Sequence, residues 1–163
     1  MSENWTGKSI LLADDEDNDA LLIKRAFKKA GINALIHRVK DGEDALSYLQ
    51  GEGIYHDRTV YPFPDMVLLD LKMPRRSGFE VLKWIRAHEH FKRLVVIVLT
   101  SSQQSFDINQ AYDLGANSYL VKPLNFEELM HLSTLLHKFW LQFCQRPEIR
   151  VTPRVTEATP NCE

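Results

Sequence analysis

The residues of this chain that could carry chemistry are acidic side chains directly following apolar segments. Asp70 closes the apolar run Met66–Leu69, and the pair Asp14 and Asp15 follows the run Ser9–Ala13. A carboxylate at the tip of a buried strand is poorly hydrated, and each further carboxylate raises the free energy of ionising the next. If the two runs are neighbouring parallel strands, the three carboxylates predict a site for Mg²⁺ (or Mn²⁺), which also accepts waters and phosphate oxygens as ligands.

Two residues of complementary chemistry follow two further apolar runs. Lys122 comes directly after the run 118–121, and Thr100 comes directly after the run 95–99. The Lys122 ammonium would neutralise charge on a phosphoryl group in transfer, and the Thr100 hydroxyl would donate a hydrogen bond to one of its oxygens. Asp70 is then the candidate nucleophile, and the product would be an aspartyl phosphate.

The elements that must position these residues alternate along the chain. Apolar runs predict strands at 10–13, 66–70, 95–99 and 118–121, and the partly alternating segment 35–39 predicts a further strand. Helical spacing and capping residues predict helices at 17–30, between 41 and 51, at 78–88, at 105–114 and from 125. This alternation favours a single α/β domain with one doubly wound, five-stranded parallel sheet and five helices. Ligands of such sheets bind outside the carboxyl ends of the strands, where all the candidate residues lie.

The composition of the chain restricts the classes of partner and the compartments that remain possible. The chain has 163 residues, with 26% charged residues and a net charge of −2, so no broad basic surface indicates nucleic acid as a partner. No apolar run approaches the roughly 20 residues of a membrane helix. The first eight residues lack a signal core, and Cys144 and Cys162 form no metal motif, which together predict a cytoplasmic protein.

The amino-acid composition of the two ends of the chain differs from that of its centre. We expect an N-terminal extension at 1–7, one folded domain at 8–146 and a flexible tail at 147–163, because the tail has Pro, Thr and Glu but little apolar content. The residues after Phe143 are too few for a DNA-binding output module. Output is therefore expected through protein contacts or through return of a phosphoryl group along a relay.

These residues together resemble the receiver domains of two-component response regulators, of which CheY is a small reference. The resemblance covers about residues 8–143 and rests on Asp14-Asp15, Asp70, Pro74, Gly78, Thr100-Ser101, Tyr119 and Lys122-Pro123. It implies the CheY-like sheet order 2-1-3-4-5. It also implies a single-domain regulator that accepts a phosphoryl group from a histidine kinase on Asp70 and is not a metabolic enzyme. The chain would catalyse only its own phosphorylation and dephosphorylation.

The resemblance further assigns roles within the site. Mg²⁺ would be held by Asp15, Asp70 and the backbone carbonyl of Lys72, with Asp14 helping through a water. On phosphorylation, Thr100 would move toward the phosphate and Tyr119 would swing inward. That movement would remodel the face made by the fourth helix, the fifth strand and the fifth helix.

Two details concern residues next to these positions. The Lys122–Pro123 bond is expected to be cis, as is usual in the family. Lys72 departs from CheY, where the corresponding position is polar but uncharged. Because a lysine there could reach the phosphoryl oxygens and crowd the attacking water, we expect it to slow hydrolysis of the aspartyl phosphate.

A narrower resemblance concerns the partner. The segment 48–55, the loop through 61–64 and the segment 98–102 are similar to stand-alone regulators that partner phytochrome-type, light-sensing kinases, and such regulators often dimerise. On a helical wheel the last helix has one wide apolar stripe, with Met130 and Leu141 outside it. The stripe comprises Leu129, Leu132, Leu135, Leu136, Phe139, Trp140 and Phe143. Its aromatic end exceeds what the sheet can cover, which predicts a homodimer through the last helix and the fifth strand.

Three other functions fit the sequence less well. A phosphatase of the haloacid dehalogenase type would need a second aspartate two residues after the nucleophile, where this chain has Lys72. A flavodoxin would need a Ser/Thr/Gly-rich phosphate loop after the first strand, where residues 14–17 are all acidic. A receiver that switches without phosphorylation would not need the complete set of site residues.

Overall fold

The protein forms one parallel sheet with helices on both faces; the computed structural model describes residues 7–149. The strands are β1 (Ser9–Ala13), β2 (Leu35–Val39), β3 (Met66–Leu69), β4 (Val95–Thr100) and β5 (Ser118–Val121). The helices are α1 (Asp17–Lys29), α2 (Gly42–Gln50), α3 (Gly78–Ala87), α4 (Ser105–Asp113) and α5 (Phe126–Leu136), with a 3₁₀ turn η1 (Gly53–His56) and a π-helical segment η2 (His137–Phe143). The strand order is β2-β1-β3-β4-β5, which confirms the predicted fold and topology.

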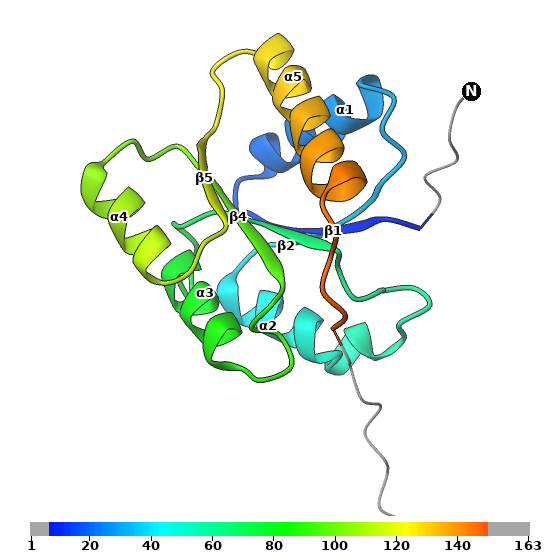
Figure 1. Ribbon diagram of the computed structural model, residues 1–163, viewed down its shortest axis with the longest axis vertical. Coiled ribbons are helices and arrows are strands. Elements are labelled where there is room, and N and C mark those ends of the chain that lie inside the picture. The colour runs from blue at the N-terminus through cyan, green and yellow to red at the C-terminus, as the bar shows by residue number, and fades with distance from the viewer. Residues whose placement is uncertain (1–6, 150–163) are drawn as a thin grey trace, which may run out of the picture.

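The helices form two layers around the sheet. Helices α1 and α5 lie side by side on one face, and α2, α3 and α4 cover the other (Figure 1). Because successive side chains of a strand point to opposite faces, each strand contributes to both cores. In β1, for example, Leu11 and Ala13 join the core under α2 to α4, whereas Ile10 and Leu12 join the core under α1 and α5. Burial on both faces explains why the central strands β1, β3 and β4 are continuous apolar runs.

Helix α3 begins unusually close to the phosphoacceptor candidate. Ser77 and Glu80 form a capping box at its start, each side chain bonding the backbone N–H of the other. A Cβ atom at Gly78 would lie 2.2 Å from the backbone carbonyl oxygen of Asp70, so only glycine allows this approach. The start of α3 is therefore fixed directly against the end of β3.

The last helix differs from the expected regular helix. From His137 the winding is π-helical, and this wider turn shifts the buried face relative to an ideal helical wheel. Leu141, which the wheel placed outside the apolar stripe, is 3% exposed, whereas Phe139 and Phe143 within the stripe are 57% and 71% exposed. The predicted excess of aromatic surface at this end is thus present.

The segment between α2 and β3 is ordered by one arginine. The Arg58 guanidinium donates hydrogen bonds to the carbonyl oxygens of Tyr48 and Leu49, at 2.8 and 2.7 Å, and so satisfies acceptors at the end of α2. The hydroxyl of Tyr48 in turn donates to Pro62 O at 3.0 Å. These bonds attach the loop to the helix that precedes it.

The amino end of β3 carries an aspartate with a complete set of partners. Asp65 Oδ2 accepts a hydrogen bond from the backbone N–H of Ser9 at 2.8 Å, and Asp65 Oδ1 pairs with the Arg146 guanidinium. Ile149 packs against the core under α2 to α4, so the first residues of the expected tail contact the domain. The rest of that tail lies outside the described residues.

Two further expectations concern the backbone. Every peptide bond within the part of the chain that the structure describes is trans, so the expected cis bond between Lys122 and Pro123 is not found. None of the helices described between residues 7 and 149 has the length and apolar character needed to cross a bilayer.

Candidate functional site

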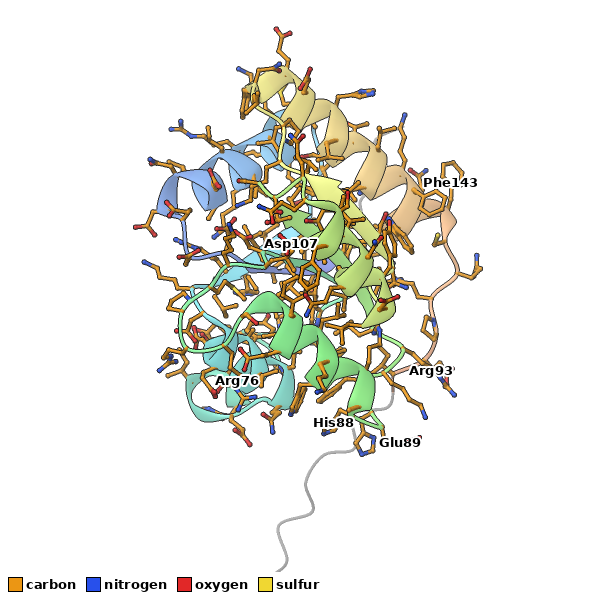
Figure 2. All side chains as sticks on the ribbon, turned by 90° about the vertical axis from the view of Figure 1, so that its left-hand side faces the viewer. Arg76, His88, Glu89, Arg93, Asp107 and Phe143 are labelled. Atoms are coloured by element: carbon orange, nitrogen blue, oxygen red, sulfur yellow. The ribbon has the colours of Figure 1, made fainter. Side chains whose placement is uncertain are left out.

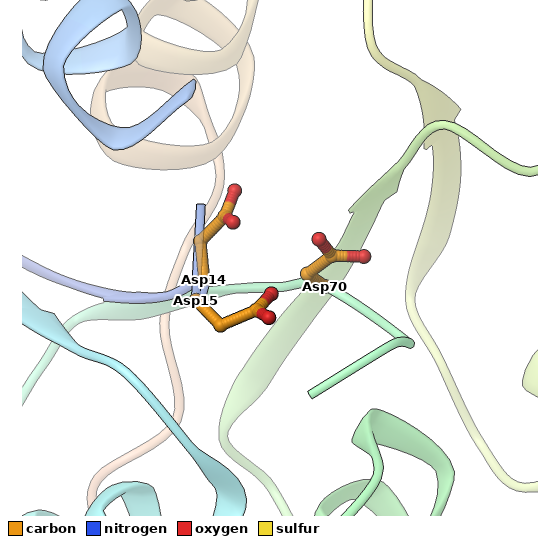
Figure 3. Close-up of side chains that lie close together, drawn as sticks. All are labelled: Asp14, Asp15 and Asp70. Atoms are coloured by element: carbon orange, nitrogen blue, oxygen red, sulfur yellow. The ribbon is translucent and has the colours of Figure 1, made fainter. Parts of the chain in front are cut away.

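Three carboxylates meet at the carboxyl edge of the sheet. Strand β1 pairs with β3 so that Ala13 lies opposite Leu69, and the residues that follow, Asp14 and Asp70, are therefore neighbours. The adjacent Asp15 completes a group whose ligand oxygens lie within 4.8 Å of one another. Figure 3 shows the carboxylate of Asp15 directed toward Asp70. Asp14 and Asp70 are buried, at 1% and 7% exposure.

The ammonium of Lys122 reaches this group from β5. The backbone N–H of Lys122 donates to the Thr100 carbonyl oxygen at 2.8 Å, which continues the β4–β5 pairing and directs the side chain across the end of β4. Its Nζ lies 2.7 Å from Asp19 Oδ2, 2.8 Å from Asp14 Oδ2 and 3.0 Å from Asp70 Oδ2. The predicted meeting of Lys122 with Asp70 and Asp14 is thus present.

Asp19 is the site residue that the sequence did not identify. It lies in the first turn of α1, where an acidic residue is expected for its favourable interaction with the helix dipole. The available signal was the acidic start of α1, where Asp17 and Asp19 both lie in the first turn. That signal does not separate Asp19 from Asp17, which instead pairs with Arg38 and Lys40.

Burial and neighbouring charges shift the pKa values of the cluster in opposite directions. Burial raises the pKa of Asp14 above its usual range, although the neighbouring Lys122 ammonium works against this rise. For Lys122, burial would lower the pKa, but its bonds to Asp14 and Asp19 and the charge of Asp70 outweigh burial and raise it. Lys122 is therefore a fixed positive charge, and the cluster as a whole has more negative charge than one ammonium can balance.

The donor set fits a hard divalent cation. Three carboxylates converge, and the buried Asp14 Oδ2 contacts the Lys122 ammonium without a well-directed hydrogen bond, so it retains capacity for a further ligand. Mg²⁺ prefers oxygen ligands of this kind and keeps part of its water shell. Such a cation would also reduce the repulsion between Asp15 and the two buried carboxylates.

A cleft of about 440 Å³ gives access to Asp70 from solvent. The backbone N–H of Lys72 lies 3.4 Å from Asp70 Oδ1, and its exposed side chain lines the cleft. Thr100, at the end of β4, is 2% exposed and lines the same cleft. The cleft is also lined by Asp15, Glu16, Asp19, Ser101, Ser102, Gln103, Gln104 and Lys122.

Tyr119 is bonded to the loop that leads from the cleft into α4. Its hydroxyl donates to the Ser102 carbonyl oxygen at 3.0 Å, and its backbone N–H donates to the Tyr112 hydroxyl at 3.1 Å. The Ser102 hydroxyl donates to Asp107 Oδ2 at 2.5 Å. Figure 2 views this side of the molecule, with Asp107 labelled at the start of α4. The two candidate switch residues, Tyr119 and Thr100, thus lie on either side of one short loop.

Comparison with known proteins agrees with this geometry. Residues 10–133 match the family model of the response regulator receiver domain. The chain is 39% identical over 138 residues to the probable methanogenesis regulatory protein FilR2 of Methanothrix harundinacea, covering 85% of this chain and 86% of FilR2. It is 34% identical to the response regulator Rcp1 of Synechocystis sp. over 140 residues, covering 86% and 93% of the two chains.

Solved structures show the same relationship. The phosphorylated cyanobacterial phytochrome response regulator RcpA is 35% identical, with a TM-score of 0.79 over 86% of this chain and 99% of RcpA. Rcp1 in its Mn²⁺-bound form has a TM-score of 0.76, with coverage of 86% and 99%. Receiving a phosphoryl group from a histidine kinase is the role of the family. By sequence, topology and the acidic cluster, this chain belongs to the response regulator receiver domain family.

Proposed function

We propose that the protein accepts a phosphoryl group from a histidine kinase on Asp70, in a Mg²⁺-dependent phosphorelay. The observation that carries this proposal is the position of Asp70: it is buried, it lies at the edge of a solvent-accessible cleft, and Lys122 Nζ lies 3.0 Å from its Oδ2. A buried carboxylate with a fixed ammonium and two further carboxylates has the parts that phosphoryl transfer requires.

In the proposed transfer, an Asp70 carboxylate oxygen attacks the phosphorus of the kinase's phosphohistidine. The new bond joins this oxygen to phosphorus, the bond between phosphorus and the imidazole nitrogen breaks, and that nitrogen keeps the electron pair. Lys122 stabilises the negative charge on the transferring group, and the Thr100 hydroxyl donates a hydrogen bond to one of its oxygens. The chain thus catalyses its own phosphorylation by the phosphodonor, and its own dephosphorylation.

A divalent cation, when bound, supplies charge neutralisation between Asp70 and the incoming phosphoryl oxygens. We assign its ligands to Asp15, Asp70 and the Lys72 carbonyl oxygen, with Asp14 acting through a water. The support is the convergence of the three carboxylates and the incomplete bonding of Asp14 Oδ2. The relative Rcp1 has been solved in a Mn²⁺-bound form, which supports a divalent metal ion as the species bound here.

The proposed switch follows from the bonds of Tyr119. In the arrangement described, its hydroxyl is held by the Ser102 carbonyl oxygen. Movement of Thr100 toward a phosphoryl group on Asp70 would vacate space beside the sheet, and Tyr119 would leave Ser102 to fill it. The result is a changed surface on α4, β5 and α5, which a partner protein can distinguish.

A phytochrome-type kinase is the partner that we propose, and the cytoplasm is the compartment. The support for the kinase is the similarity to RcpA, a phytochrome response regulator.

Phosphotransfer from a panel of purified histidine kinases, phytochrome-type kinases included, tests the proposal with Asp70→Ala as the control. We expect label transfer to the natural chain and none to the variant. Transfer that survives Asp70→Ala would overturn the assignment of the acceptor, and turnover of a generic phosphate ester would favour a phosphatase instead.

We also propose a homodimer through α5, η2 and β5. Leu135, Phe139 and Phe143 are 50%, 57% and 71% exposed along one end of this helix, and Figure 2 shows Phe143 at the surface. Sedimentation at tens of micromolar (an order-of-magnitude choice) should show a dimer that Phe143→Glu converts to monomer. Ile54→Glu, at an equally exposed position in η1, serves as the matched control. A monomer for the natural chain, with and without phosphorylation, would exclude the dimer.

A further inference from the structure

The Lys122 ammonium is shared between the candidate phosphoacceptor and a carboxylate on α1 that does not belong to the candidate metal group. Lys122 Nζ donates directed hydrogen bonds to Asp70 Oδ2 at 3.0 Å and to Asp19 Oδ2 at 2.7 Å. The shorter of the two bonds therefore runs toward α1, away from the candidate phosphoacceptor. No part of the receiver motif found in the sequence includes position 19.

Asp19 differs from the other carboxylates around Lys122 in two respects. Its side chain is 37% exposed, whereas those of Asp14 and Asp70 are 1% and 9% exposed. It is also not one of the three carboxylates that converge as a candidate metal group. Asp19 can therefore return to water at low cost if its partner leaves, whereas the two buried carboxylates cannot.

Phosphorylation of Asp70 changes what competes for the ammonium. A phosphoryl group brings negatively charged oxygens to the end of β3, next to Lys122 Nζ, and charge-assisted hydrogen bonds to such oxygens are strong. Lys122 has three donor hydrogens, and two are already directed to Asp19 and Asp70. The contact with Asp19 is the one that can be exchanged without leaving a buried charge unpaired.

We propose that Asp19 is a positioning residue that holds Lys122 toward α1 in the unphosphorylated protein and releases it when Asp70 is phosphorylated. This inference rests on the proposed function of Asp70. An ion pair that exists only before phosphorylation stabilises that state, so Asp19 raises the amount of phosphodonor needed to load the protein. Asp19 thereby sets the threshold of the switch without contacting the phosphoryl group.

The test uses the full chain with saturating Mg²⁺ and phosphoramidate as the phosphodonor. The phosphorylated fraction is measured by intact mass across a series of donor concentrations. Asp19→Asn should lower the donor concentration for half phosphorylation by about twofold to fivefold, the range expected for losing a partly exposed ion pair. Asp19→Ser should act in the same direction, because it removes the charge and also shortens the side chain. Asp19→Glu keeps the carboxylate and should restore most of the natural behaviour.

The matched control is Glu16→Gln. Glu16 lines the same cleft and carries the same charge, but the structure gives its side chain no contact with Lys122. If Glu16→Gln lowers the required donor as much as Asp19→Asn, the effect is one of general charge and the proposal fails. It also fails if Asp19→Asn and Asp19→Ser leave the requirement unchanged or raise it. Failure of the proposed function is separate, because then the natural chain itself would not be phosphorylated on Asp70.

Discussion

Strand β3 carries an aspartate at each end, and the two differ in how their charge is balanced. At the amino end, Asp65 has a backbone N–H and a guanidinium as partners, so its charge is matched by one cation. At the carboxyl end, Asp70 shares one ammonium with Asp14 and Asp19, and Asp15 lies alongside. A carboxylate at a strand end is therefore not a functional site in itself. An excess of negative charge that the chain leaves unbalanced distinguishes the site.

The largest expected effect comes from making the same substitution at both ends of β3. Asp70→Asn should lower phosphorylation by more than about 1000-fold, because it removes the nucleophile. It should not lower the free energy of unfolding in metal-free buffer, because it relieves repulsion within the cluster. Asp65→Asn should leave phosphorylation unchanged and lower the free energy of unfolding by about 1 kcal/mol, since it leaves Arg146 without its charged partner.

Both quantities can be measured on the same preparations, by phosphotransfer and by urea denaturation with EDTA. Impaired phosphorylation in a folded Asp65→Asn variant would contradict the proposed difference between the two ends of β3. A larger loss of stability for Asp70→Asn than for Asp65→Asn in the metal-free protein would contradict it as well.

The second expected effect concerns the cationic side chain that pairs with the aspartate at each end of β3. Lys122→Gln should slow phosphorylation by phosphoramidate by about 100-fold, because it removes charge stabilisation in the transition state. Arg146→Gln should leave that rate unchanged, since Arg146 lies at the opposite end of the strand. Initial rates at saturating Mg²⁺ provide the measurement. A comparable loss of rate in both variants would show that the two ends are coupled.

The third effect is a pH dependence expected at the carboxyl end. Burial raises the pKa of Asp14, so the folded chain keeps this proton at pH values where the unfolded chain has lost it. The free energy of unfolding of the metal-free protein should therefore fall as pH rises from about 4, the ordinary carboxyl range, through the raised pKa of Asp14. Asp14→Asn should remove this contribution, so its stability relative to the natural chain should increase as pH rises.

Urea denaturation with EDTA from acidic to neutral pH checks the sign. Asp65→Asn is the matched variant. The difference in free energy of unfolding between this variant and the natural chain should not increase with pH in the same way. If the Asp14→Asn difference is constant with pH, the raised pKa of Asp14 is wrong. Addition of Mg²⁺ at neutral pH should stabilise the natural chain and have less effect on Asp14→Asn.

The smallest effect concerns Lys72, a second cation near Asp70. We expect Lys72→Asn to shorten the lifetime of the aspartyl phosphate by about threefold, because an ammonium that reaches the phosphoryl oxygens stabilises them and hinders the attacking water. Dephosphorylation is followed after removal of the phosphodonor. Lys83→Asn, an exposed position on α3, is the control. An unchanged lifetime in Lys72→Asn would contradict the role of this residue.

Sequence alone predicted the fold because the central strands β1, β3 and β4 are buried on both faces and are continuous apolar segments in the sequence. It predicted that Asp14, Asp70 and Lys122 converge because parallel strands present their carboxyl ends at one edge. It did not predict Asp19, because the spacing of helical residues does not show which side chain of a first turn points to the sheet. It placed Leu141 outside the buried face because the π-helical winding after His137 has no marker in the apolar pattern.

The close contact at Gly78 has a mechanical consequence. With the α3 backbone packed directly against the Asp70 carbonyl oxygen, the chain on that side has little free space into which it could move. On the other side, Tyr119 is attached to the loop after β4 by a hydroxyl bond to Ser102 that water can replace. In the proposed switch, a change at Asp70 is therefore passed toward α4 and β5, the side on which the contacts are hydrogen bonds rather than close backbone packing.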